Sequence, residues 1–189
     1  MKTTLLGSIA FLSVLVAIAV AAAPNEPKPA PADAAVARGK YLVTAMGCAD
    51  CHTPMKLGPN GPEPDLARNF SGHPAEFVMP PAPKLPPGPW MATVAATMTA
   101  WSGPWGTSFT ANLTPDPETG LGQWTADDFV ATMKTGRHMG RGREILPPMP
   151  IPAVKNFTEE DLRAIFAYLR SLPAVKNRVP APLPPAEAR

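Results

Sequence analysis

The two cysteines of this chain stand in a pattern that can attach a haem covalently. Cys48 and Cys51 are separated by two residues, and His52 follows at once. Two thiols about one helical turn apart can each form a thioether with one haem vinyl group, and the adjacent imidazole can bind the iron. The spacing therefore predicts one c-type haem, attached through Cys48 and Cys51, with His52 as the proximal iron ligand.

Three other uses of such a cysteine pair compete with haem attachment. A redox dithiol would need a βαβ context, whereas the segment before the motif has a helical pattern and the segment after it is rich in proline. A zinc site would need two further ligands, and the only other histidines are His73 and His138. A disulfide between these two cysteines would close too short a loop to add much stability.

A second axial ligand is predicted from the position of one methionine. Met149 stands in the sequence LPPMPIP, directly before the last predicted helix. The alternating prolines make a stiff, non-helical loop that can present a thioether at a small cost in chain entropy. Methionine sulfur and histidine nitrogen are the usual second ligands of such a haem, so we expect Met149, with Met79, His73 and His138 as alternatives.

Three stretches without proline are where helices can form. The first helix is expected from Asp33, as N-cap, to about Met46, with Gly47 in the left-handed conformation that ends many helices. The other two are expected to begin after a threonine that has an aspartate three residues later, as in a capping box. The first of these two is expected from Thr125 to Gly136, and the second from Thr158 to Pro173.

Gly39 lies inside the first predicted helix. Glycine in a helix interior costs roughly 1 kcal/mol relative to alanine, which suggests that another helix crosses closely at this point. The last predicted helix is the expected partner, because its apolar residues recur at helical spacing on one face. These residues are Leu162, Ile165, Phe166, Leu169 and Leu172.

The composition excludes some classes of fold and of partner. Proline accounts for 27 of the 189 residues, and about half of these prolines lie between residues 54 and 117. Each proline removes a backbone donor, so this middle region is expected to be loop and short turn. The formal charge is only +2, and no basic stripe is interleaved with aromatic residues, so no nucleic-acid partner is indicated.

The N-terminus has the pattern of an export signal. A positive start is followed by an apolar run that ends in small residues, which predicts a signal peptide at residues 1–22, cleaved after Ala22. The alternative is an uncleaved membrane anchor, because the run approaches the roughly 20 residues that span a bilayer. The domain limits predicted from composition are a proline-rich linker at 23–32, one domain at 33–178 and a proline-rich tail at 179–189.

The order of these motifs resembles that of class I monohaem cytochromes c. The resemblance rests on GKYL at residues 39–42, CADCH at 48–52, the Pro-Pro-Met-Pro loop and the final helix TEEDLRAIFAYLRSLP. The stretch from Asn112 to Pro150 is similar to cytochrome c domains of bacterial periplasmic dehydrogenase systems. Small class I cytochromes separate histidine and methionine by a shorter stretch, and the surplus here lies mainly in residues 54–111.

The resemblance implies an all-α cytochrome c fold, with three to five helices around one covalently bound haem c. The surplus at 54–111 departs from the family and is expected to form a long Pro-rich irregular insert. The resemblance also implies ligation by His52 and Met149, and packing of the first and last helices near Gly39 and Phe166 or Tyr168. The function implied is one-electron transfer in the periplasm, without catalytic residues. The partners implied are redox proteins, a dehydrogenase as donor and an oxidase or a cytochrome as acceptor.

Two supporting roles around the haem are also expected, the first of them from the family pattern. A proline carbonyl after the attachment motif accepts the other ring proton of the proximal histidine, and Pro59 and Pro62 both qualify here. Trp124, Arg137 and Arg143 are candidates for contacts with the haem propionates, because buried anions need partners. The basic run at 134–143 could equally be a docking patch for an acidic protein, or simply a solvated face.

Two further functions compete with the carrier. A peroxidase-like or gas-binding haem protein would have a displaceable sixth ligand and a nearby acid-base group, for which His73 or His138 are candidates. A docking subunit would use the insert at 54–111, with its Trp101 and Trp105, more than its haem. Whichever of these functions applies, the protein is expected at a membrane only if the N-terminal segment remains as an anchor.

Overall fold

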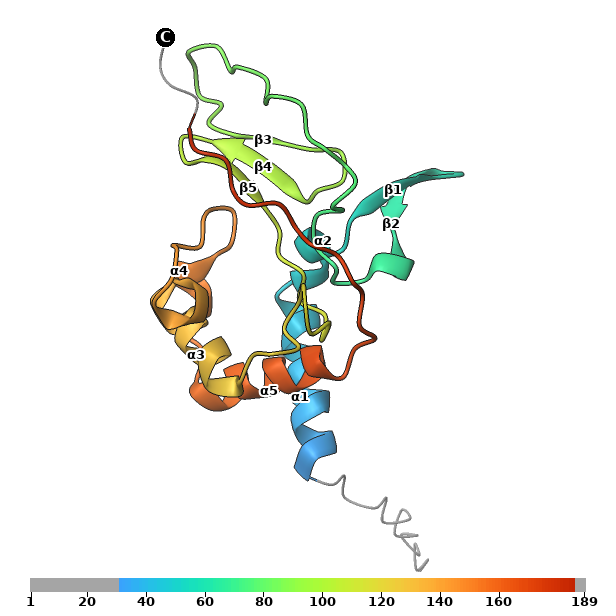
Figure 1. Ribbon diagram of the computed structural model, residues 1–189, viewed down its shortest axis with the longest axis vertical. Coiled ribbons are helices and arrows are strands. Elements are labelled where there is room, and N and C mark those ends of the chain that lie inside the picture. The colour runs from blue at the N-terminus through green and yellow to red at the C-terminus, as the bar shows by residue number, and fades with distance from the viewer. Residues whose placement is uncertain (1–30, 186–189) are drawn as a thin grey trace, which may run out of the picture.

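The computed structural model describes residues 31–185 (Figure 1). The predicted signal at 1–22, residues 23–30 of the predicted linker and residues 186–189 of the tail lie outside this range. No helix within it is long and apolar enough to cross a membrane. The described range holds five α-helices: α1 (Pro31–Ala45), α2 (Cys48–His52), α3 (Ala126–Thr135), α4 (Ile151–Val154) and α5 (Glu159–Arg170).

The insert at 54–111 contains two small antiparallel sheets, with strand orders β1-β2 and β3-β4-β5. The expectation of loop and short turn holds for residues 69–92 but missed these two sheets, and the all-α expectation describes only the helical part. The strands are only two to four residues long, so most prolines of the insert fall between them, and Pro62 and Pro64 lie in β2, which pairs with β1 alone. The strands and 3₁₀ turns are β1 (Met55–Gly58), β2 (Gly61–Pro64), η1 (Leu66–Arg68), β3 (Thr93–Val94), β4 (Ala100–Gly103), β5 (Gly106–Phe109) and η2 (His138–Gly140).

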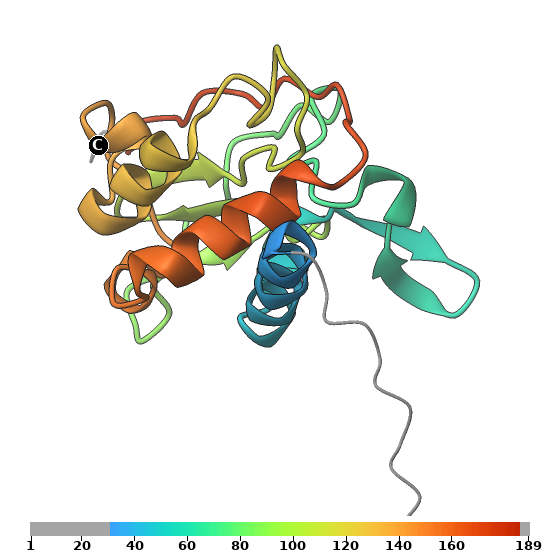
Figure 2. The same ribbon diagram turned by 90° about the horizontal axis from the view of Figure 1, so that it is seen from below.

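The core forms where α5 lies across α1 (Figure 2). A Cβ atom on Gly39 would lie 1.9 Å from the carbonyl oxygen of Ala164 and 2.8 Å from Cβ of Tyr168, so only glycine allows the two helices to approach this closely. The predicted crossing is thus confirmed. The predicted apolar face of α5 lies against the core, with Leu162, Ile165, Phe166 and Leu169 buried and Leu172 packed against them.

The caps predicted for α3 and α5 are confirmed. The Thr125 hydroxyl accepts the amide proton of Asp128, whose carboxylate accepts from the Thr125 backbone, and Gly136 ends α3 at φ 69°. Thr158 likewise caps α5 by accepting from the amide of Asp161. The Asp161 carboxylate is also bound by Arg38 of α1, with 2.9 Å between Nε and Oδ1, so this cap residue also ties the two crossing helices together.

The start of α1 differs from the prediction. The helix begins at Pro31, so Asp33 lies inside its first turn and is not the N-cap. Proline suits the start of a helix because its φ is already helical, and a carboxylate in the first turn interacts favourably with the helix dipole. The predicted helix end is confirmed, since Gly47 has φ 63° and ψ 31°.

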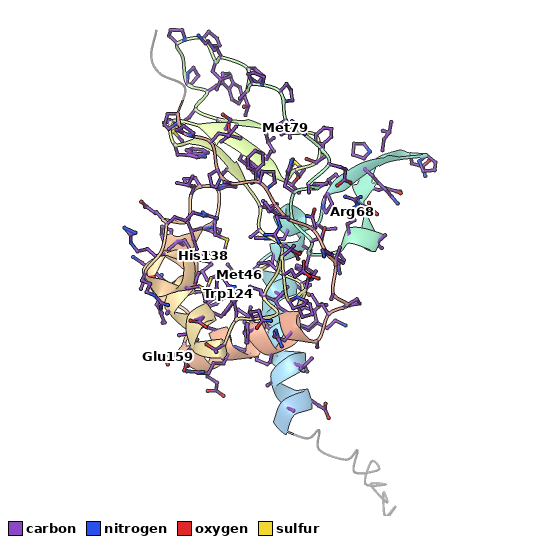
Figure 3. The ribbon with its side chains drawn as sticks, viewed as in Figure 1. Met46, Arg68, Met79, Trp124, His138 and Glu159 are labelled. Carbon is purple, nitrogen blue, oxygen red and sulfur yellow. The ribbon has the colours of Figure 1, made fainter. Side chains whose placement is uncertain are left out.

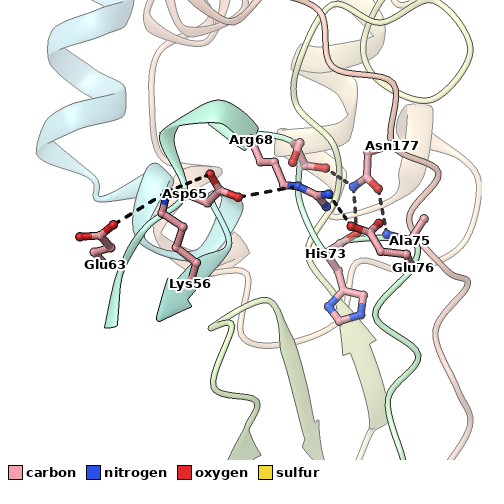
Figure 4. Close-up of polar contacts among 9 residues, drawn as sticks. Lys56, Glu63, Asp65, Arg68, His73, Ala75, Glu76 and Asn177 are labelled. Carbon is pink, nitrogen blue, oxygen red and sulfur yellow. Dashed lines mark hydrogen bonds and ion pairs between the residues drawn. The ribbon is translucent and has the colours of Figure 1, made fainter. Parts of the chain in front are cut away.

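Ion pairs order the first part of the insert, as Figure 4 shows. Lys56 on β1 lies 3.8 Å from a Glu63 oxygen and 3.7 Å from an Asp65 oxygen. Arg68, the last residue of η1, pairs with both Asp65 and Glu76, so these ion pairs join η1 to the segment around Glu76. These side chains are partly exposed to solvent, so we expect them to fix the path of the chain more than to add stability.

The segment after α5 runs back over the insert and is held there by Asn177 (Figure 4). The amide nitrogen of this buried side chain donates to the carbonyl oxygens of Ser71, at 2.7 Å, and His73, at 2.8 Å. Its oxygen accepts from the Ala75 amide at 2.9 Å. Farther on, Leu183 and Thr107 exchange backbone hydrogen bonds, so part of the predicted tail extends the sheet at β5.

Candidate functional site

The attachment motif forms the short helix α2, which packs against the core. Cys48 and Cys51 are both free and half-buried, and Cys48 contacts the hydrophobic cluster. Burial raises the pKa of both thiols above the usual value for cysteine, so both are protonated at neutral pH. The left-handed Gly47 lets the chain turn from α1 directly into α2. One helical turn therefore presents two thiols and an imidazole together.

The ring of His52 is buried and held by one hydrogen bond. Its Nδ1 lies 2.8 Å from the carbonyl oxygen of Ala111. Because a carbonyl can only accept, Nδ1 carries the proton and Nε2 carries the lone pair that binds a metal. Burial lowers the pKa of His52, although this hydrogen bond opposes the effect, so the imidazole is neutral at neutral pH.

The prediction that a proline carbonyl after the attachment motif orients His52 was therefore wrong. Pro59 lies at the exposed tip of the β1–β2 hairpin and Pro62 lies within β2, whereas Ala111 provides the acceptor. The hairpin carries both prolines out of reach, because β1 and β2 pair with each other from Met55 to Pro64. No feature of the sequence marks Ala111, since it acts through its backbone and any residue type has a carbonyl there.

Tertiary contacts fix the position of the Ala111 carbonyl. The chain after β5 runs beside residues 70–73, where the His73 amide donates to Thr110 and the Leu113 amide donates to Phe70. Gly72 makes this approach possible, because a Cβ atom on it would lie 2.6 Å from backbone atoms of Ala111. The acceptor for His52 thus belongs to a hydrogen-bonded segment, not to a free loop.

The loop that carries Met149 directly precedes α4. In the view of Figure 1, this loop lies across from α2, with the sheet β3-β4-β5 above it and α5 below it. Met149 is half-buried and packs against the same hydrophobic cluster that Cys48 contacts. The hydroxyl of Ser108 on β5 donates to the carbonyl oxygen of Pro147, with 2.5 Å between the oxygens. No sequence pattern indicated this contact between insert and loop.

Two of the three alternative axial ligands, Met79 and His73, lie in less suitable places. Figure 3 shows Met79 on the insert, beside the β3 end of the sheet and away from α3 and α4. His73 is fully buried, and both of its ring nitrogens are engaged, Nδ1 with the Thr99 hydroxyl and Nε2 with the Phe77 carbonyl. A histidine whose two nitrogens are both hydrogen-bonded has no lone pair free for a metal.

The residues predicted to contact the propionates lie near the loop that carries Met149. Trp124 packs against the core, and its ring meets that of His138 edge to face, with centroids 5.0 Å apart (Figure 3). Arg137 and Arg143 are exposed, and their side chains bond to backbone carbonyls of their own loop, those of Gly142 and Glu144. Contact with propionates stays a prediction for these three residues.

The comparison with known families agrees with this arrangement. The model of the family described as Cytochrome c matches residues 36–173, which include most of α1, α2, the insert and all the later helices. This chain belongs to the cytochrome c family. Membership implies a covalent haem c, and the CxxCH pattern with a half-buried cysteine pair and an Nδ1-protonated His52 provides the side chains that such a haem requires.

Similar proteins include cytochrome subunits of bacterial dehydrogenases. The chain is 32% identical over 136 residues, 72% of its length, to the gluconate 2-dehydrogenase cytochrome c subunit of Pantoea cypripedii, of which it covers 23%. It is 32% identical over 150 residues, 76% of its length, to the cytochrome c subunit of the quinone alcohol dehydrogenase of Gluconacetobacter polyoxogenes, of which it covers 25%. It is 27% identical over 154 residues, 78% of its length, to the fructose dehydrogenase cytochrome subunit of Gluconobacter japonicus, of which it covers 24%. The chain thus spans a quarter or less of these relatives' lengths.

Proposed function

We propose that this protein is a periplasmic one-electron carrier whose single haem c is attached through Cys48 and Cys51 and ligated by His52 and Met149. The observation that carries the proposal is the hydrogen bond from Nδ1 of His52 to the Ala111 carbonyl, because it leaves Nε2 unprotonated and fixes the direction of the ring. A neutral imidazole held in one tautomer on a CxxCH helix is suited to ligating haem iron.

Met149 is the second ligand in this proposal. It packs against the cluster that Cys48 contacts, whereas Met79 lies on the insert and His73 has both nitrogens engaged. The bound haem supplies the one-electron couple of its iron. In this proposal both axial side chains stay in place, so electron transfer requires no exchange of ligands. Ligation on both sides of the iron also leaves no open position for a substrate. We therefore infer a carrier without catalytic residues of its own.

We propose a dehydrogenase as the electron donor and an oxidase or another cytochrome as the acceptor. The gluconate and alcohol dehydrogenase relatives are cytochrome subunits by name, and the similarity to them extends over 72% and 76% of this chain, respectively. The exposed Arg137 and Arg143 are the candidate docking charges if they do not contact the propionates, and such charges mainly raise the rate of association. Copurification with a flavin- or quinone-containing dehydrogenase tests whether the protein is a subunit or diffuses freely.

The periplasm is the proposed location because residues 1–22 have the pattern of an export signal. Intact-mass measurement of protein from a periplasmic extract should show a chain beginning at Ala23 and carrying one haem. A full-length chain in the membrane fraction would favour the anchor instead.

An optical spectrum tests the ligand set. The ferric protein should show the long-wavelength charge-transfer band of a methionine-ligated haem, and Met149→Ala should abolish it. Met79→Ala is the matched control and should retain the band. If the wild-type protein lacks the band and binds carbon monoxide or cyanide readily, the site is a ligand-binding one and the carrier proposal fails.

A further inference from the structure

Strand β5 and the residues that follow it contact both segments that hold the proposed axial ligands. The hydroxyl of Ser108, on β5, donates to the Pro147 carbonyl, two residues before Met149. Three residues after Ser108, the Ala111 carbonyl accepts from His52. A single short stretch of the insert therefore reaches the loop of one proposed ligand and the ring of the other.

The Ser108 hydroxyl is committed to the loop before Met149. Its side chain is buried, with 8% of the residue's surface exposed. The distance to the Pro147 oxygen is 2.5 Å, whereas its other neighbour, the Trp101 carbonyl, lies at 3.4 Å. A hydroxyl has one proton, and the shorter contact is the stronger hydrogen bond. The proton therefore goes to Pro147.

The backbone of the loop can donate few hydrogen bonds to the insert. Pro147, Pro148 and Pro150 have no N–H group, so this stretch cannot form a backbone ladder with the sheet beside it. Among residues 31–185, the Pro147 carbonyl accepts one hydrogen bond, the one from Ser108. This bond joins residues far apart in the sequence, so losing it frees the loop to move away from the insert.

Strand β5 is itself firmly placed. It pairs with β4 from Ala100 opposite Phe109 to Gly103 opposite Gly106. On its other edge, Thr107 exchanges two backbone hydrogen bonds with Leu183, at 3.0 and 2.9 Å. Ser108 thus stands on a strand that is bonded on both edges, which suits a residue that must hold another segment in place.

We propose that Ser108 is a positioning residue that keeps Met149 on the haem iron. The inference rests on the proposed function, because it requires Met149 as the axial ligand. Ser108 acts through the Pro147 carbonyl and does not itself touch the haem or the iron in this proposal. In this proposal, displacement of Met149 by an external ligand moves the loop and breaks this hydrogen bond, so the bond opposes displacement.

Imidazole titration of the ferric holoprotein tests this, with loss of the methionine charge-transfer band as the signal. Ser108→Ala should bind imidazole about three- to tenfold more tightly than the wild type, which is the effect of losing one hydrogen bond from the methionine-bound state. Ser108→Thr keeps the hydroxyl and should restore the wild-type affinity. Ser102→Ala is the matched control, because the Ser102 hydroxyl accepts a hydrogen bond from the Thr107 hydroxyl within the same sheet and does not reach the loop of Met149 through any hydrogen bond among residues 31–185. This variant should leave the affinity unchanged.

The outcomes separate this inference from the function on which it rests. If Ser108→Ala lowers the melting temperature but binds imidazole as the wild type does, Ser108 is merely structural and the inference is wrong. The same conclusion follows if Ser102→Ala raises the affinity as much as Ser108→Ala. If the wild-type band is missing, or if it survives in Met149→Ala, the ligand assignment has failed instead, and the positioning role falls with it.

Discussion

Replacing Gly39 by alanine should force α1 and α5 apart. The new Cβ atom would lie 1.9 Å from the Ala164 carbonyl oxygen, and a backbone atom cannot rotate away as a side chain can. We take the cost at the upper end of overpacking, about 3 kcal/mol, and subtract the roughly 1 kcal/mol that alanine gains over glycine in a helix. The expected net loss of stability is about 2 kcal/mol.

Thermal unfolding of the mature holoprotein, followed by circular dichroism, measures this loss. For a domain of this size, about 2 kcal/mol corresponds to a fall in melting temperature of roughly 4–8 °C. Gly88→Ala is the matched control, because the nearest atom to a Cβ there is the Pro86 oxygen at 3.9 Å. This control should melt at the wild-type temperature or slightly above it.

The opposite sign of the effect would refute the reasoning. If Gly39→Ala melts at or above the wild-type temperature, then helix propensity outweighs the contact, and the two helices are not packed as closely as described. A similar fall in both glycine variants would attribute the effect to glycine replacement in general and not to the crossing.

Three other changes follow from the described contacts. Thr125→Ala removes the N-cap of α3 and should cost about 1 kcal/mol, measured by denaturant unfolding. Asn177→Ala leaves buried backbone groups of the insert unsatisfied and should cost roughly 2–3 kcal/mol, with faster hydrogen exchange at the Ala75 amide. The hydrogen bond from Arg38 holds the pKa of the Asp161 carboxyl below its usual value, so the stabilisation is present above the pKa of the unfolded state and is lost as the pH falls through the folded value. The difference in melting temperature between wild type and Asp161→Asn should therefore be larger at about pH 6 than below about pH 3.

Each of these changes has a control on the same kind of element. Thr44→Ala, at an exposed site in α1, should be neutral or slightly stabilising, because alanine is the better helix former. Asn156→Ala loses one exposed bond to the Pro152 carbonyl and should cost much less than Asn177→Ala. Glu160→Gln changes the carboxylate next to Asp161, which is not the one that pairs with Arg38, and should lower the melting temperature less than Asp161→Asn at about pH 6. If any control matches its test variant, the contact assigned to that variant is not what stabilises the protein.

Local patterns in the sequence were enough to predict α3, α5 and most of α1, but not α4, which begins at Ile151 inside the loop predicted to be non-helical. The caps at Thr125 and Thr158 and the left-handed glycines at 47 and 136 depend on residues within one turn, so their residue types determine the outcome. The crossing at Gly39 was also predictable, because an interior helical glycine has few reasons other than close packing. The start of α1 was not, since proline and aspartate are both favourable in the first turn.

The amino-acid sequence by itself determined the attachment motif, because CxxCH needs only residue types and a spacing of one helical turn. Only the tertiary structure decided which groups surround it. The partner of His52 is the backbone of Ala111 in place of Pro59, and the partner of the Met149 loop is Ser108. Both contacts join segments distant in the sequence, and one of them uses a carbonyl that every residue has. Residue type therefore carries no signal for it, and the path of the folded chain alone brings that acceptor to the histidine.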